Sequence, residues 1–116
     1  MQFKLVVALV EDAKVNAVLK AARDAGATGA TIITSGRGEG LIPQKTFFGL
    51  DLSSHRDMVL FVVEQHLSRR ILEKVAEAAS LETEPGSGIA FQIAIEDAIG
   101  LKTQIEQLSK KIEDHI

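Results

Sequence analysis

Hydrophobic positions along the chain recur with two periods, and the change from one period to the other predicts the order of strands and helices. Residues 4–10 form a short run rich in Val and Leu, which is typical of a strand covered on at least one face. Apolar side chains then recur at helical spacing over residues 15–25, with Asp12 placed to cap the helix and Gly26 placed to end it. Residues 27–34 are rich in β-branched side chains and predict a second strand.

Residues 35–55 interrupt this alternation and predict a long excursion with a short strand in its second half. Loops of this length inside a compact domain are usually functional or disordered. Beyond the excursion, residues 58–63 predict the most hydrophobic strand, residues 67–79 an amphipathic helix and residues 89–95 a fourth strand. A stripe of Leu and Ile in steps of four and three then predicts a second amphipathic helix over residues 101–115.

This order of elements predicts an α+β fold of the ferredoxin-like βαββαβ type, with a long loop after strand 2 and a C-terminal helix. A single domain is expected to span residues 1–116, with the loop at 36–56 and the tail helix at about 101–115. Helices are expected on one face of a four-stranded antiparallel sheet, although the strands are apolar on both sides. Because isolated domains rarely leave a large apolar patch in water, self-association is expected to cover the other face.

The composition excludes several classes of function. The chain has no Cys, so disulfides, thiolate nucleophiles and cysteine metal sites are ruled out. A net charge of −3 argues against non-specific nucleic-acid binding. Because no segment approaches the roughly 18 apolar residues of a membrane span, a cytoplasmic protein without membrane insertion is expected. The three His lack metal-ligand spacing and no nucleophile–base set is visible, so neither a metal site nor an enzyme is expected.

Four short segments, in a fixed order, carry a resemblance to a known family. They read G-A-T-G-A-T at 26–31, G-R-G at 36–38, G-S-G at 86–88 and I-E-D-A-I at 95–99. In that order they resemble four features of the PII signalling family: the G-x-T-G-x-T at the second strand, the G-x-G before the T-loop, the G-D-G of the B-loop and the V-E-E-A-I run. The spacings nearly match, and the resemblance covers most of the chain.

The resemblance implies a homotrimer that acts as a sensor. Small effectors bind in the clefts between PII subunits, and the T-loop changes shape to engage or release a partner. The usual effectors are ATP or ADP, and 2-oxoglutarate with Mg²⁺. Typical partners are ammonium transporters and enzymes of nitrogen metabolism.

The glycine pattern and the resemblance together indicate which residues would form the site. Ligand contacts are expected at Thr28, Gly36, Arg37, Gly38, Arg56, Gly86, Ser87, Gly88 and Lys102. Glycines let backbone N–H groups approach a phosphate, although two tight turns would use the same glycines. The apolar loop residues Leu41, Ile42, Phe47 and Phe48 are expected to bind the partner, with a short strand packed on the trimer as the alternative for the two phenylalanines.

Several positions depart from the family pattern at functional places. Ile89 stands where the B-loop has a phosphate-gripping Lys, and Glu82 and Glu84 lie upstream of it. Loss of a charge-assisted donor costs about 1.5–3 kcal/mol of interaction with an anion. The family's R-x-R pair becomes Gly100 and Lys102, and its Gln after the G-x-G is absent. The chain has no Tyr, which excludes nucleotidylation of a T-loop tyrosine.

These patterns predict a divergent PII-like trimer that senses a small ligand between its subunits and regulates a partner, such as a membrane transporter, through its T-loop. No cofactor is required. The effector is an adenine nucleotide of lower charge, another small anion, or none. The alternative is a ligand-independent trimeric adaptor that docks through its apolar loop.

Overall fold

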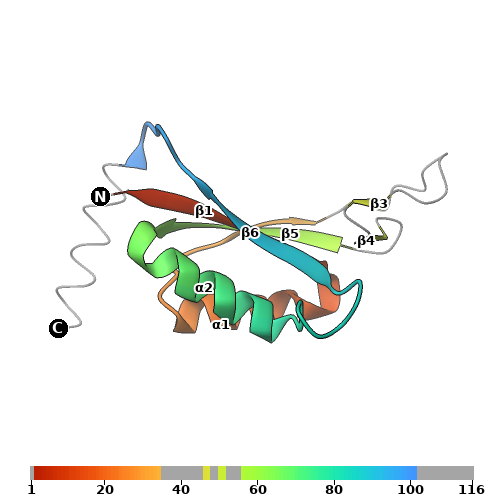
Figure 1. Ribbon diagram of the computed structural model, residues 1–116. Helices are drawn as coiled ribbons and strands as arrows, with labels where there is room; N and C mark the ends of the chain where they lie inside the picture. The colour runs from red at the N-terminus through yellow and green to blue at the C-terminus, as the bar shows by residue number, and fades with distance from the viewer. Residues whose placement is uncertain (1, 35–45, 48–49, 52–55, 102–116) are drawn as a thin grey trace.

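The computed structural model describes residues 2–34, 46–47, 50–51 and 56–101. Its main feature is a four-stranded antiparallel sheet in the order β2-β5-β1-β6, with both helices against one face (Figure 1). In chain order the elements are β1 (Phe3–Glu11), the 3-10 turn η1 (Asp12–Lys14), α1 (Val15–Asp24), β2 (Thr31–Thr34), β3 (Thr46–Phe47), β4 (Leu50–Asp51), β5 (Arg56–Glu64), α2 (Gln65–Ala78) and β6 (Gly88–Ala94). The predicted ferredoxin-like α+β fold is confirmed.

The first helix begins differently from its prediction and ends as expected. Asp12 does not cap it, because Asp12 instead begins η1. Neither Glu11 nor Lys14, the residues at the cap positions of η1 and α1, makes a side-chain capping bond. At the other end, Gly26 follows with a φ of 115°, a conformation that glycine adopts without steric cost.

The region after α1 is less regular than the sequence suggested. β2 is shorter than the predicted strand 27–34, since pairing to β5 begins only at Thr31. Within the predicted excursion, β3 and β4 pair as a short hairpin. The rest of that excursion lies outside the described residues, as does the predicted tail helix beyond residue 101.

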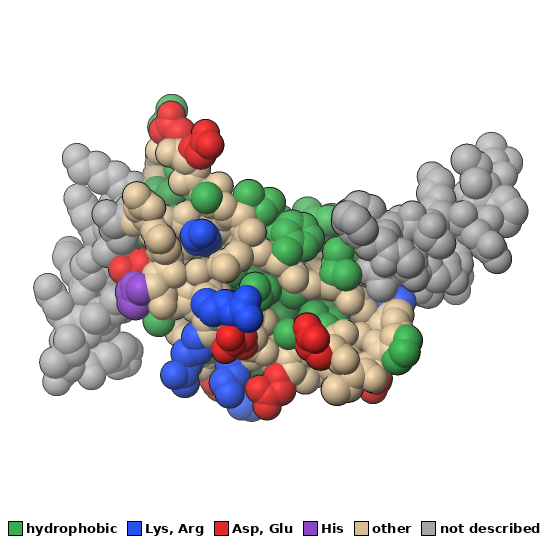
Figure 2. All heavy atoms as spheres, in the orientation of Figure 1, with side chains coloured by type: hydrophobic (Ala, Val, Ile, Leu, Met, Phe, Trp, Pro, Cys, Tyr) green, Lys and Arg blue, Asp and Glu red, His purple; other side chains and the backbone are tan. Residues whose placement is uncertain are grey.

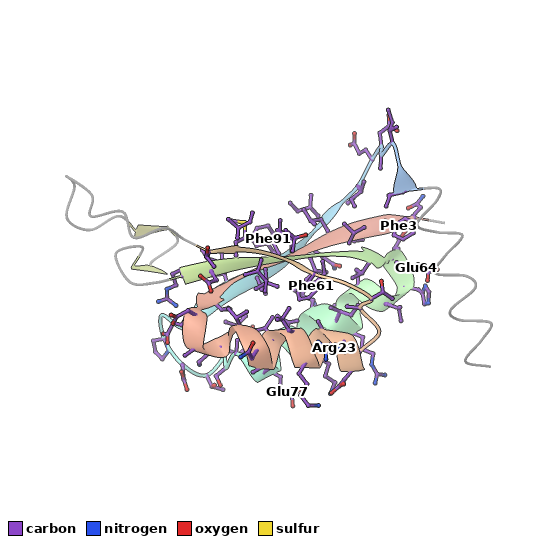
Figure 3. All side chains as sticks on the ribbon, turned by 180° about the vertical axis from the view of Figure 1, so that it is seen from behind. Phe3, Arg23, Phe61, Glu64, Glu77 and Phe91 are labelled. Atoms are coloured by element: carbon purple, nitrogen blue, oxygen red, sulfur yellow. The ribbon has the colours of Figure 1, made fainter. Side chains whose placement is uncertain are left out.

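The core lies between the helices and the sheet face that they cover. The register places Val6 opposite Phe61 and Ala8 opposite Val59, and all four are almost fully buried. Figure 3 shows Phe61 between the sheet and the helices. The helices add Val18, Ala22, Ile71 and Val75. Each large apolar side chain buried in this way contributes about 1.5–3 kcal/mol of stability, so these residues hold the helices against the sheet.

The opposite face of the sheet is also apolar but has no layer over it among the described elements. Successive strand residues point to opposite faces, so Leu5, Val7 and Leu9 of β1 point away from the helices. Their neighbours across the sheet on this bare face are Val62, Leu60 and Met58 of β5 and Ile93, Phe91 and Ile89 of β6. Ile33, Val62, Phe91 and Ile93 are 39–51% exposed.

The two sides of the molecule differ in chemistry. Figure 2 shows charged side chains gathered over the helices and hydrophobic ones toward the sheet, while Figure 3 shows Phe91 projecting away from the helices. This bare face meets the expectation of an apolar surface that needs a cover. Neither described helix is long and apolar enough to cross a membrane.

Candidate functional site

The glycine turn, defined here as residues 80–88 between α2 and β6, has its backbone bonded mainly to itself. Ser80 adopts a φ of 56° after the last turn of α2, which reverses the chain. The Ser80 carbonyl accepts hydrogen bonds from the Thr83 and Glu84 backbone N–H groups at 3.3 and 3.0 Å. It also accepts one from the Ser87 hydroxyl at 3.1 Å. The Ser87 N–H donates to the Glu84 carbonyl at 3.2 Å, so the turn is closed at both ends.

Arg56 joins the glycine turn to the sheet. It is the first residue of β5, and β1 lies between β5 and β6, so its side chain spans the end of β1. Its Nη1 donates to the Ser87 carbonyl at 2.9 Å, and its Nη2 donates to the Gly86 carbonyl at 2.6 Å. Glu11 Oε1 lies 3.7 Å from Nη1. Arg56 is only 6% exposed, so its charge is held among these oxygens and largely away from water.

Lys14 is the second cation that holds the same region. Its Nζ donates to the Ala79 carbonyl at 2.9 Å, just beyond the end of α2. The same atom pairs with Glu84 Oε2 at 2.9 Å. A cation at a helix C-terminus also interacts favourably with the helix dipole. The turn is therefore tied to β5 through Arg56 and to η1 through Lys14.

Gly88 makes the close approach of the turn to β1 possible. It has a φ of 148°, and a Cβ there would overlap the Leu9 carbonyl oxygen. Gly86 also has a positive φ, 74°, but has open space around its Cα. Both positions favour glycine because of their positive φ, and Gly88 also requires it because a side chain would overlap the backbone of β1.

The predicted ligand residues fall into three groups. Gly86, Ser87, Gly88 and Arg56 lie together at one end of the sheet. Thr28 is exposed and precedes β2, which is the opposite edge of the sheet from β6, so one chain does not bring it to the glycine turn. The others lie outside the described residues, namely Gly36, Arg37, Gly38 and Lys102.

The predicted partner residues cannot be placed in the same way. Leu41, Ile42 and Phe48 lie outside the described residues. Phe47 ends β3, where the backbone alone is described. Their partner-binding role stays a prediction.

The glycine turn borders an open groove of about 780 Å³ between α2 and the start of β6. Leu72, Ala76 and Ile89 supply apolar lining, and Glu82 and Arg69 supply charged lining. Glu82 and Glu84 are exposed. Within the part of the chain that the structure describes, no group of three or more His, Asp or Glu is arranged to hold a metal ion. Three carboxylates, of Glu73, Glu77 and Glu82, and one guanidinium, of Arg69, line the groove, so its charged lining is mainly acidic.

Sequence reasoning missed Lys14, Glu84 and Ser80 as parts of the turn's framework. Lys14 fits the polar side of an amphipathic pattern, and nothing local marks it as a tether. Its partners lie 65 and 70 residues away in the chain. Ser80 acts through its backbone carbonyl, which carries no signature in a side-chain pattern.

The comparison with known protein families gives one match. The sequence model of the family described as Nitrogen regulatory protein P-II matches residues 3–105. No curated protein matches the sequence significantly. Proteins of this family are signalling regulators rather than enzymes, are typically homotrimers, and bind adenine nucleotides and partner proteins. Since the match extends over most of the sequence and the fold agrees with it, the chain belongs to the P-II nitrogen regulatory protein family.

Proposed function

We propose that this chain works as a homotrimeric PII-type regulator in which a small ligand binds between subunits, beside the glycine turn. The ligand would change the order of residues 37–54, within the T-loop of the resemblance, and so change binding to a partner such as a membrane transporter. The protein would act in the cytoplasm and reach the membrane through that partner. The observation that carries the proposal is the bare apolar face, which association with other copies of this chain would remove from water.

The separation of Thr28 from the glycine turn supports a site shared between subunits. β2 and β6 are the two edges of the sheet, so residues near them cannot meet within one chain. In a ring of copies, the β2 edge of one subunit can lie beside the β6 edge of the next. Such a ring would bring Thr28 of one subunit toward Gly86, Ser87 and Gly88 of its neighbour.

The charges around the turn favour a ligand of low charge. Glu82 and Glu84 lie within the turn, and Ile89 provides no cation where the family pattern has Lys. The Lys14 ammonium is already paired with Glu84. An adenine nucleotide with fewer phosphates than ATP, or another small anion, would meet less repulsion here. No cofactor is needed for this role.

A ligand-independent adaptor is the second candidate, and one observation favours it. The Arg56 guanidinium donates to two carbonyls of the turn, and the Ser87 N–H donates to Glu84. These two donors, which could otherwise hold an anion, are therefore occupied within the chain. A trimer of this kind would dock constantly through its apolar loop residues.

Two measurements test these proposals. Light scattering should give three times the 12.5 kDa protomer mass, whereas a monomer would contradict both candidates. The melting temperature should then be followed with ATP, ADP, AMP, cyclic nucleotides, 2-oxoglutarate and bicarbonate. A ligand at a hundred times its dissociation constant adds about 2.7 kcal/mol to the free energy of unfolding. If none of these compounds raises the melting temperature of the trimer, the adaptor replaces the sensor.

A further inference from the structure

The glycine turn needs a contact that stabilises one backbone conformation over the others, because its glycines allow several. Gly86 and Gly88 both have positive φ. Glycine adopts positive φ about as readily as negative φ, so neither residue is restricted to the conformation seen here by its own sterics. Pro85, Gly86 and Ser87 provide no hydrophobic anchor in this stretch, and Ser87 is the one buried residue among them. Two glycines this close could therefore adopt several turn geometries unless polar contacts choose one.

The Arg56 guanidinium makes the hydrogen bonds that can stabilise one conformation of the turn. Its two terminal nitrogens donate to two successive carbonyls, those of Gly86 and Ser87. A planar guanidinium offers several donors in a fixed geometry, so it can set the direction of both carbonyls at once. An ammonium on a flexible stem is a point charge and does not impose the same geometry.

The peptide between Gly86 and Ser87 is used at both of its polar ends. Its carbonyl accepts from Arg56 Nη2 at 2.6 Å, and its N–H donates to the Glu84 carbonyl at 3.2 Å. The orientation of this peptide plane therefore depends on Arg56 on one side and on the turn itself on the other. If the guanidinium is removed, the Gly86 carbonyl loses its partner and the Ser87 N–H loses its fixed direction.

Burial separates this role from the direct ligand contact expected from the sequence. With 6% of its surface exposed, Arg56 cannot reach an outside ligand without leaving the carbonyls it holds. We propose that Arg56 is the positioning residue of the glycine turn, a built-in cation that orients the Gly86 and Ser87 peptides on which a ligand would be received. The proposal refines the site of the proposed function, but its test requires no ligand.

The test compares amide hydrogen exchange by NMR in the wild-type protein and in Arg56→Ala, without ligand. The Ser87 amide should exchange at least about tenfold faster in the variant, because a charge-assisted bond to a buried group has been removed. Amides of the central strand, such as Val6 and Ala8, should keep their rates, which separates loosening of the turn from global unfolding. Lys20→Gln removes an exposed cation paired with Asp24 on α1 and should leave the Ser87 exchange rate unchanged.

Chemical rescue gives a readout that a merely space-filling role would not give. Guanidinium chloride at about 50 mM, far below the molar range that unfolds proteins, should return the Ser87 exchange rate in Arg56→Ala to within about twofold of the wild-type rate. Urea has nearly the same shape but no charge, and should not restore it. Equal restoration by urea would show that the cavity, and not the cation, matters and would overturn the proposal.

Arg56→Lys keeps the test decisive if the alanine variant does not fold. Lysine keeps the charge but can serve the two carbonyls less well, so the Ser87 rate should rise several-fold with the core amides unchanged. An unchanged Ser87 rate in this variant, or in a folded Arg56→Ala, refutes the positioning role. Because no ligand enters the experiment, that result would leave the proposed sensor function standing, and a failed ligand panel would leave the Arg56 result standing.

Discussion

Gly88 stands where β6 passes closest to the backbone of β1. Its partner in the register is Val10, and the Leu9 carbonyl lies in the space that a side chain would need. The nearest other atom to a Cβ at this position belongs to Leu81, 3.2 Å away. A glycine at the start of β6 is therefore required by packing, whatever ligand the turn receives.

Replacing Gly88 by Ala should destabilise the protein much more than replacing Gly86. Gly88→Ala combines a positive φ with an overlap against backbone, and we expect a loss of roughly 2–4 kcal/mol in the free energy of unfolding. Gly86→Ala meets no neighbouring atom within 4 Å, so it should lose only about 1–2 kcal/mol from its φ. Urea unfolding of both variants measures the difference, and equal losses would contradict the steric explanation.

At the scale of elements, η1 and the end of α2 are joined by one side chain. The Lys14 side chain is 22% exposed and contacts both the Ala79 carbonyl and the Glu84 carboxylate. By contrast, Lys20 pairs with Asp24 one helical turn away on the surface of α1, with its side chain 75% exposed. The two lysines have the same charge, but Lys14 joins separate elements whereas Lys20 pairs within its own helix.

Lys14→Met should therefore lower the free energy of unfolding by about 1–2 kcal/mol, because a partly buried carbonyl and a carboxylate lose their donor. Lys20→Met is the matched control and should cost less than about 0.5 kcal/mol, as exposed i,i+4 pairs do. Denaturant titration of the two variants gives both values. If Lys14→Met behaved like the control, the tether would have no role in stability.

The elements also show how far sequence patterns reach. The helical spacing around Val18 and Ile71 predicted both helices and the residues they bury, because amphipathic periodicity is a local property. β2 was overestimated because its β-branched residues suit a strand, whereas β5 supplies partners only from Thr31 onward. The predicted cap at Asp12 failed because a 3-10 turn precedes the helix.

At the scale of the whole molecule, the bare face determines what the protein needs from other copies. Ile32 and Ile33 are consecutive on β2 and similarly exposed, at 43% and 51%. The register places Ile33 opposite Met58 on the bare face, and Ile32 opposite Val59 on the helix side. The two isoleucines therefore make a matched pair of mutation sites that differ in the face of the sheet on which they lie.

Ile33→Asp should break the proposed trimer into monomers, because burying an unpaired carboxylate in an apolar interface costs several kcal/mol. Ile32→Asp carries the same substitution on the other face and should remain trimeric. Light scattering of both variants at the same concentration compares the masses. A trimeric Ile33→Asp would show that the bare face is not the contact between subunits.

The amino-acid sequence by itself determined the order of the main strands and helices, the helix residues that face the core and the exclusion of thiol chemistry. These follow from periodicity and composition, which depend on near neighbours and on residue type. Tertiary structure alone decided that Arg56 faces carbonyls of the turn, that Gly88 is sterically required and that Thr28 lies at the far edge of the sheet. Such contacts join residues 30 or more positions apart, and strand register, which no local pattern records, brings them together.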